Sequence, residues 1–387
     1  MSRGPASRIR VGLTLACAGL TAGCGTQAAT VAVTRPPAVT ASLSTSLITA
    51  QGTWAIAVMG GPAASHNNFW QLFVRRANTG RWSLATPGGV ADNGGLVAAG
   101  GPGSLVVGFR PSQELAYSPL ATSTDAGLNW TPGLLDAALA DTPGAIAVGP
   151  SGRTLALLQD GTIEAAPTAD DAAAGRWVPL ATLKALAASV PGRSCGLKGV
   201  TAVSFGPDQN PIAAGSCVRP GAAGVFTDAG GTWRSAGLTL PTGGPGMGTV
   251  RVLGLTAIPG GNAALLAVGN SWLAAWWDGT RWTVSAPVTA DGVRALGFGP
   301  GGSAWLLLDS ERTETIAGAA GSTWRALPPV PAGTKVLAPP GALAPGTAGS
   351  YDALAVSGSK LTVWRLARGA WGKVQQITVP VQYGSSG

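Results

Sequence analysis

The chain has 387 residues, of which 45% are hydrophobic and 11% are charged. This composition and a mean hydropathy of +0.27 exclude an intrinsically disordered chain and allow a large core. The formal net charge is +8, but apart from Arg75-Arg76 the arginines occur singly. Binding to a phosphate backbone needs a clustered basic stripe, so nucleic acid is not an expected partner.

The first 23 residues have the pattern of an export signal. Three arginines precede an apolar run at 11–22, which is too short to span a bilayer. The next residues, Leu20-Thr21-Ala22-Gly23-Cys24, resemble a bacterial lipobox, although Thr21 stands where Leu or Val is usual. The resemblance implies cleavage before Cys24 and a diacylglyceryl group on its thiol. An ordinary secretory signal cut near Ala28-Ala29 is the alternative.

The segment 24–45 is rich in Thr, Ala, Ser and Pro, and it predicts a flexible tether ahead of a folded domain at 46–387. Without the export signal, 22 basic and 17 acidic residues remain, a net charge of +5. We expect the domain at the outer face of the cytoplasmic membrane, held by the lipid on Cys24. If the segment is an ordinary secretory signal, the protein is instead secreted.

Cys195 and Cys217 are the only cysteines after Cys24, and an exported protein meets an oxidising compartment. We therefore predict a disulfide between them. In the chain-entropy model a loop of this length adds about 3 kcal/mol of stability. Two cysteines and the single histidine, His66, do not supply a metal site, and no motif indicates a cofactor.

The rest of the chain repeats. Seven tryptophans, each following a turn, recur at intervals of 42 to 56 residues: Trp82, Trp130, Trp177, Trp233, Trp282, Trp324 and Trp371. A period in the forties with four short strands per unit is typical of propeller blades. The sequence predicts an all-β, seven-bladed β-propeller with four-stranded antiparallel blades.

The strands can be placed most directly in two of the repeats. In the first repeat they are expected at 46–50, 53–58, 69–76 and 82–85, and in the sixth at 293–298, 304–308, 315–318 and 323–327. Leucines spaced by three in 180–187 predict one or two helical turns between the third and fourth blades, which the disulfide would pin to the fourth. The apolar tail 377–381 is a candidate to complete a sheet shared by the first and last blades.

One segment carries a recognisable motif. Ser123, Asp125, Gly127 and Trp130 match the Asp-box, S-x-D-x-G-x-x-W, and a second copy keeps Asp228, Gly230 and Trp233 but has Phe226 in place of the serine. The pattern is similar to the Asp-box (BNR) repeat of the sialidase-like propellers. In that family the box lies at the outer edge of a blade, away from the central site. The expected role is local: Asp accepts backbone N–H bonds, Gly supplies a positive φ, and Trp packs between sheets.

The catalytic set of a sialidase does not accompany the box in recognisable form. That set comprises three arginines, a Tyr–Glu pair and an acid/base Asp, and the early Arg-Ile-Pro motif is absent. None of the tyrosines and glutamates has a family context: Tyr117, Tyr351, Tyr383, Glu114, Glu164, Glu311 and Glu314. Two carboxylate pairs remain open to proposal, as does a densely aromatic region: Asp170-Asp171, Asp309 with Glu311, and Trp272, Trp276, Trp277 and Trp305.

The sequence favours a membrane-anchored, extracytoplasmic module that binds or assembles a protein or a glycan, without catalytic residues and as a monomer. A sialidase-like glycoside hydrolase is the alternative. Resemblance to Asp-box assembly factors and sortilin-type receptors also leaves a chaperone-like role toward another exported protein open. Each of these functions is implied by resemblance, since fold does not fix function.

Overall fold

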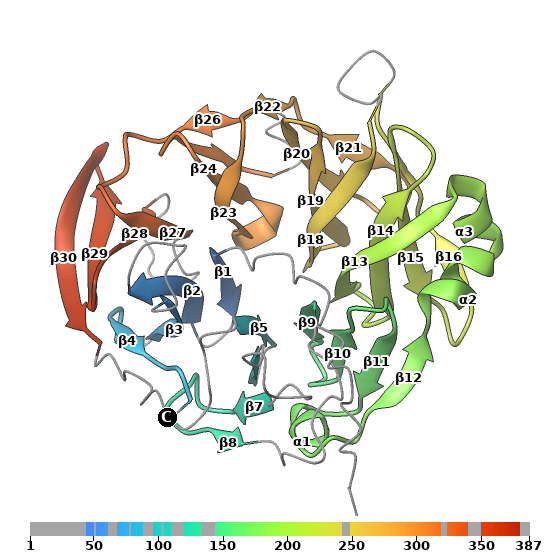
Figure 1. The fold of residues 1–387 in the computed structure, drawn as a ribbon, viewed down its shortest axis with the longest axis horizontal. Coiled ribbons are helices and arrows are strands. Elements are labelled where there is room, and N and C mark those ends of the chain that lie inside the picture. The colour runs from blue at the N-terminus through green and yellow to red at the C-terminus, as the bar shows by residue number, and fades with distance from the viewer. Residues whose placement is uncertain are drawn as a thin grey trace, which may run out of the picture. The chain divides into compact units, whose positions relative to one another are not determined.

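The computed structural model describes residues 44–49, 52–60, 68–76, 79–87, 96–101, 104–109, 120–132, 144–241, 248–318, 323–339 and 350–379 (Figure 1). The export signal, Cys24 and His66 lie outside the described residues, as does nearly all of the predicted tether. The first strand begins at Ser44, two residues before the predicted start of the domain.

The described chain folds into seven blades of antiparallel strands in a ring, as predicted. Within each blade, four consecutive strands pair in chain order from the inner to the outer edge. The blades are β1(Ser44–Thr49) to β4(Trp82–Leu84) with β2(Gly52–Gly60) and β3(Asn68–Arg76); β5(Leu96–Gly100), β6(Leu105–Phe109), β7(Leu120–Ser123) and β8(Thr131–Pro132); β9(Ala145–Val148), β10(Thr154–Leu157), β11(Ile163–Ala166) and β12(Val178–Ala181); β13(Leu197–Phe205), β14(Pro211–Cys217), β15(Ala222–Asp228) and β16(Trp233–Ser235); β18(Val250–Ile258), β19(Gly261–Val268), β20(Ser271–Trp277) and β21(Trp282–Val284); β23(Val293–Phe298), β24(Ala304–Leu308), β25(Thr313–Ile316) and β26(Arg325–Ala326); and β27(Thr334–Ala338), β28(Asp352–Ser357), β29(Lys360–Ala367) and β30(Ala370–Thr378).

Two short strands extend the fourth and fifth blades. β17(Leu238–Thr239) pairs with β15, and β22(Val288–Thr289) pairs with β20. The predicted inner strands of the sixth blade are confirmed to the residue as β23 and β24, whereas β25 begins two residues earlier than predicted. The outer strand β26 is harder to place because it pairs with β25 over only two residues.

Each blade is buried on both faces by its neighbours. β19 in the fifth blade is buried along its whole length, so its pattern is continuous rather than alternating. Its Leu266 packs in one cluster with Val225 of the fourth blade, whereas Leu265 packs in another cluster with Leu306 of the sixth blade. Alternation along the strand thus sends successive residues into two different cores.

The first blade makes one contact that repeat counting does not predict. β1 pairs with β2 in its own blade and also, in parallel, with β23 of the sixth blade, from Ser44↔Ala295 to Ser46↔Gly297. The two blades therefore form one eight-stranded sheet. A parallel ladder requires two strands that run in the same direction, which inner strands of different blades satisfy.

Within the described residues no blade combines strands of the first and last repeats, so the prediction for the tail was wrong in its described part. Ile377 lies in β30 and pairs with Leu361 of the same blade, while Pro380 and Val381 lie outside the described residues. The first and seventh blades meet instead through side chains and a single bridge. The Gln375 amide accepts from the Trp82 backbone N–H (3.0 Å) and donates to the Trp82 carbonyl (2.7 Å). The Gly60 N–H donates to the Gly358 carbonyl.

A buried carboxylate completes this junction. Asp352 of β28 is fully buried and accepts bonds from Arg75 Nη1 of β3 (2.6 Å), Trp82 Nε1 of β4 (2.9 Å) and Arg365 Nε of β29 (2.8 Å). Burial lowers the pKa of Arg75, and the hydrogen bond to Asp352 raises the pKa of Arg365. We call Asp352, Arg75, Trp82 and Arg365 the closure cluster. It joins residues about 270 positions apart at the two ends of the ring.

Three short helices lie in the third repeat and between the third and fourth blades. α1(Ala169–Ala173) follows β11, and α2(Leu183–Ala188) and α3(Val190–Cys195) confirm the predicted helical insertion. The predicted disulfide is also confirmed: Cys195 at the end of α3 bonds Cys217 at the end of β14, with Cα atoms 5.4 Å apart. Leu186 of α2 is buried against this part of the core.

Candidate functional site

The seven described inner strands carry no carboxylate. Their charged residues are all basic, and each is the second residue of its strand: Lys198, Arg251, Arg294 and Lys335. A glycoside hydrolase of the sialidase or two-carboxylate type needs acidic side chains beside the reacting sugar. These strands do not supply any.

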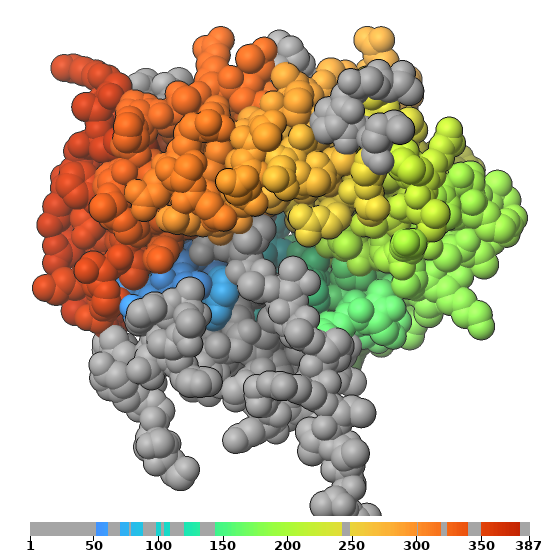
Figure 2. Space-filling view, turned by 45° about the horizontal axis from the view of Figure 1, so that its top comes forward, coloured from blue at the N-terminus to red at the C-terminus, as the bar shows by residue number. Residues whose placement is uncertain are grey.

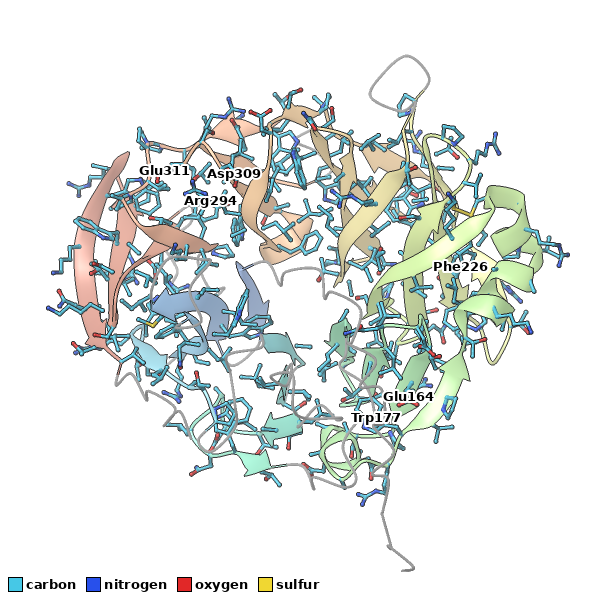
Figure 3. All side chains as sticks on the ribbon, viewed as in Figure 1. Glu164, Trp177, Phe226, Arg294, Asp309 and Glu311 are labelled. Atoms are coloured by element: carbon cyan, nitrogen blue, oxygen red, sulfur yellow. A yellow bond between two sulfur atoms is a disulfide. The ribbon has the colours of Figure 1, made fainter. Side chains whose placement is uncertain are left out.

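The acidic pairs considered from sequence have structural partners. Asp309 and Glu311 lie on either side of the exposed Arg294 guanidinium, each 3.5 Å from it (Figure 3). Asp171 is part of the α1 N-terminus, where the Thr168 hydroxyl donates to it and lowers its pKa, and it pairs with Arg176. Asp170 is exposed. Neither pair forms an acid and a base facing a common space.

The other residues of a possible catalytic set are dispersed. Tyr351 packs against the core between the first, sixth and seventh blades, and burial raises its pKa. Glu164, in the third blade, also has a pKa raised by burial. Tyr117, Tyr383 and Glu114 lie outside the described residues. Among the described residues no group of His, Cys, Asp and Glu side chains could hold a metal ion, and no helix is long enough to cross a membrane.

The first Asp-box segment forms a tight turn between β7 and β8. Asp125 Oδ1 accepts the backbone N–H groups of Leu128 (2.9 Å) and Asn129 (2.8 Å), and the Ser123 hydroxyl donates to the same oxygen. These bonds, the Asn129 backbone bond foremost, hold the pKa of Asp125 at about 2. Gly127 has a φ of 76°, and a Cβ there would lie 3.0 Å from the Ala85 side chain. The segment therefore needs glycine for both conformation and space.

Trp130 packs its ring against the core between the first and second blades, but it is only partly buried. Replacing a fully buried tryptophan by alanine typically costs about 3–5 kcal/mol, so Trp130→Ala should destabilise the domain by less than that. Urea unfolding of both proteins measures the difference. A loss within error of zero would show that the ring contributes nothing to the blade contact.

The second copy has a simpler turn. Asp228 is buried and accepts the Gly231 N–H (2.7 Å), Gly230 has a φ of 66°, and Trp233 packs beside the core of the third and fourth blades. Phe226, which replaces the serine, is fully buried in that core. A serine hydroxyl at that position would have to find a buried partner, so the phenylalanine exchanges a turn bond for packing.

The aromatic region is mostly intersheet packing. Trp272 and Trp276 lie on one face of β20, as the alternation predicts, and both are buried against the sixth blade. Trp305 is fully buried on the opposite side of that blade. These three rings cannot stack on a sugar. Trp277, on the other face of β20, is partly exposed and lies at a 45° tilt to Trp282.

A surface that the sequence did not reveal lies around the disulfide. Four exposed basic residues come together there from α3, β13, the loop after β14 and β18, and we call them the basic patch: Arg193, Lys198, Arg219 and Arg251. Val190 and Val218, next to them, are 72% and 59% exposed. In Figure 2 the green and yellow-green surface of this part of the chain faces solvent.

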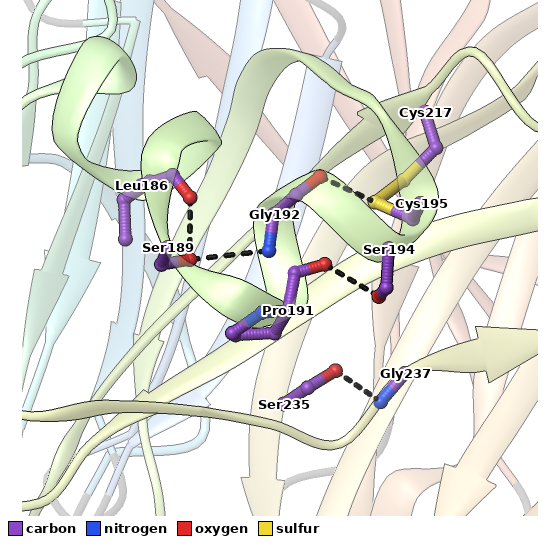
Figure 4. The surroundings of a disulfide bond; sticks show 9 residues. All are labelled: Leu186, Ser189, Pro191, Gly192, Ser194, Cys195, Cys217, Ser235 and Gly237. Atoms are coloured by element: carbon purple, nitrogen blue, oxygen red, sulfur yellow. Dashed lines mark hydrogen bonds between the residues drawn. A yellow bond between two sulfur atoms is a disulfide. The ribbon is translucent and has the colours of Figure 1, made fainter.

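The disulfide between Cys195 and Cys217 (Figure 4) and three backbone bonds fix the patch in place. The Val218 N–H donates to the Gly196 carbonyl (2.8 Å) and the Arg219 N–H to the Cys195 carbonyl (3.2 Å). On the other side, the Gly221 N–H donates to Gly248, which lies just ahead of β18. The end of α3, the end of β14 and the start of β18 are thus bound together.

The part of the chain that carries the patch is poor in acids. From 172 to 277 the chain has two acidic residues, Asp208 and Asp228. Asp208 lies in the turn between β13 and β14, and Asp228 is the last residue of β15, whereas the patch is at the start of β13 and of β15. Both acids are therefore at the opposite end of the blade. At the same end of the ring, neighbouring blades carry Asp160, in the turn between β10 and β11, and Asp291, just ahead of β23. Asp309 and Glu311 of the sixth blade pair with Arg294.

Sequence reasoning missed this patch because its residues are separated by up to 58 positions and occur singly. Scattered basic residues look like ordinary surface charges until the fold brings them together. The scarcity of acids across 172–277 is the signal that could have indicated a basic surface in the fourth and fifth blades.

Comparisons with known proteins identify the fold alone. No family model and no curated protein sequence matches the chain. A solved protein from Lactobacillus plantarum has 13% sequence identity and a TM-score of 0.51, over 84% of this chain and 96% of that one. A putative 6-phosphogluconolactonase from Bacteroides uniformis (13%, TM-score 0.49, 85% and 97%) and YCF48 from Cyanidioschyzon merolae (16%, 0.44, 87% and 95%) are also similar. At these identities the likeness supports the propeller fold and no activity.

Proposed function

We propose that the protein is an exported binding or assembly module for a protein or glycan, anchored to the outer face of the cytoplasmic membrane by a lipid on Cys24. One observation carries the non-catalytic part of this proposal: every charged residue of the described inner strands is basic, so these strands bring no acid to the axis of the ring. The lipobox-like segment at 20–24 and the basic n-region support the membrane anchor.

The described aspartates support the same reading. Asp125 and Asp228 hold turns at the blade edge, and Asp352 joins the ends of the ring. A panel of fluorogenic glycosides, including a sialoside, should therefore give no turnover above buffer. Turnover that Asp309→Asn or Glu311→Gln abolishes would establish the alternative, a glycoside hydrolase.

The anchor has its own test in Cys24 and in Cys17 of the export signal. Cys24→Ser should move the protein from the membrane fraction to the soluble extracytoplasmic fraction, because the thiol that takes the lipid is lost. Cys17→Ser is the matched control and should leave the protein in the membrane, since Cys17 lies inside the apolar run. Fractionation with immunoblotting measures both. A Cys24→Ser protein that stays with the membrane would disprove the lipid anchor.

A further inference from the structure

The basic patch has the features needed to bind a flat, negatively charged surface with an apolar interior. Its four cations have long flexible side chains, and none of them forms an ion pair with another described residue. Within the patch, Arg193 donates to the Ala188 carbonyl at the end of α2. Val190 lies one helical turn before Arg193, so the two share a face of α3.

We propose that the basic patch is a second membrane contact, in which Arg193, Lys198, Arg219 and Arg251 bind anionic lipid headgroups and Val190 and Val218 enter the interface. This inference rests on the membrane location proposed above. A basic residue close to an anionic bilayer contributes attraction that falls off within a Debye length, and exposed apolar side chains add burial at the headgroup boundary.

The composition of the patch favours a bilayer over a protein partner. Protein interfaces are rich in aromatic residues and arginine and depleted in lysine, and their affinity comes from aromatic or arginine anchors in packed pockets, whereas the arginines of the patch are exposed. The patch has no aromatic residue, and its apolar members are two separate valines. Headgroup binding needs exposed positive charge that no ion pair neutralises, and the four cations of the patch form no ion pair with a described residue.

A lipid on Cys24 would make even a weak contact effective. Counting Cys24 itself, twenty residues (24–43) precede Ser44. A chain of that length spans at most about 70 Å. A domain held within that distance of the surface meets it at a high effective concentration, so a patch of four charges suffices.

The contact would also set the orientation of the ring. The patch lies at the start of β15, where the Ala222 N–H donates to Arg219, and the second Asp-box copy lies at the end of the same strand, at Asp228. With the patch on the bilayer, the turns that carry Asp125 and Asp228 face away from the membrane and stay accessible to a partner.

Vesicle co-sedimentation tests the contact independently of the lipid. The full-length Cys24→Ser chain is mixed with phosphatidylcholine vesicles, with or without 30% phosphatidylglycerol, at low and high salt. The test variant carries Lys198→Glu, Arg219→Glu and Arg251→Glu. The control variant makes the same charge change at exposed residues of the sixth and seventh blades, Arg325→Glu, Arg368→Glu and Lys373→Glu. The export signal, with its three arginines, is common to all proteins.

We expect phosphatidylglycerol to increase binding in the parent and in the control, and high salt to reverse the increase. The test variant should lose about a hundredfold in affinity for these vesicles, on the order of a factor of five for each reversed charge. Circular dichroism and mass spectrometry of the intact disulfide confirm folding. If the reversal prevents folding, Lys198→Gln, Arg219→Gln and Arg251→Gln replace it with a smaller expected loss.

Three results would overturn the inference. One is equal binding to both kinds of vesicle, and another is an equal loss in the test and control variants. The third is patch-dependent binding to poly-L-glutamate or heparin without binding to phosphatidylglycerol vesicles, which would assign the patch to an acidic polypeptide or glycan. None of these outcomes depends on the lipid anchor, which the Cys24→Ser and Cys17→Ser fractionation tests separately.

Discussion

Asp352→Asn is expected to destabilise the domain by about 3–5 kcal/mol, because it leaves two arginines in the junction without their counter-charge. Asp352 is fully buried and binds Arg75, Arg365 and the Trp82 indole. Arg75 also donates to Thr53 Oγ1 and to the Pro339 carbonyl, so its guanidinium cannot move to solvent without breaking further bonds. Urea unfolding followed by tryptophan fluorescence measures the loss.

Asp309→Asn is the matched control for this prediction. It removes the same charge from an ion pair whose Asp309 and Arg294 side chains are 58% and 44% exposed. Exposed pairs of this kind contribute about 0–1 kcal/mol, so stability should hardly change. Equal effects of the two substitutions would mean that the closure cluster does not hold the ends of the ring together. Limited proteolysis near the first and seventh blades should also be faster in Asp352→Asn alone.

The second large effect is expected from removing the disulfide. The double variant Cys195→Ala and Cys217→Ala should lose about 3 kcal/mol, since the bond closes a loop of 22 residues in the unfolded chain. The local stability of α3 should also fall, because without the disulfide the hydrogen bonds of Val218 and Arg219 are the described backbone bonds that join the end of α3 to the end of β14. Denaturant unfolding with and without a reducing agent measures both contributions.

The redox control is internal to the experiment. A reducing agent should lower the stability of the parent to that of the double variant and leave the double variant unchanged. Parent and variant of equal stability under oxidising conditions would show that the bond constrains neither state. Because the patch residues flank the bond, the double variant should also bind phosphatidylglycerol vesicles less tightly than the parent, though by less than the charge reversal.

The propeller could be predicted because its signals are local and repeat. Turn residues and short apolar runs mark many of the strands, so the bounds of β23 and β24 were predicted to the residue and the seven tryptophans gave the number of blades. The chemistry of the Ser123 to Trp130 turn is likewise contained within eight residues: Asp125 binds the N–H groups three and four positions ahead. The disulfide followed from counting the cysteines that remain after the export signal.

The closure of the ring and the basic patch depend on contacts between distant segments. Asp352 has no acidic or turn motif to distinguish it, and its partner Arg75 is 277 residues away. The parallel pairing of β1 with β23 adds a strand contact that no repeat contains. Arg193, Lys198, Arg219 and Arg251 become a surface only when α3, β13, β14 and β18 meet.

The sequence by itself determined the repeat, the strands and the turns, because hydrogen bonds within a hairpin involve neighbours in the chain. Only the tertiary structure decided which charges are buried, which are neutralised and which gather on one face. Burial and electrostatic attraction depend on distance in space, and a single chain does not specify that distance until its blades are packed against one another.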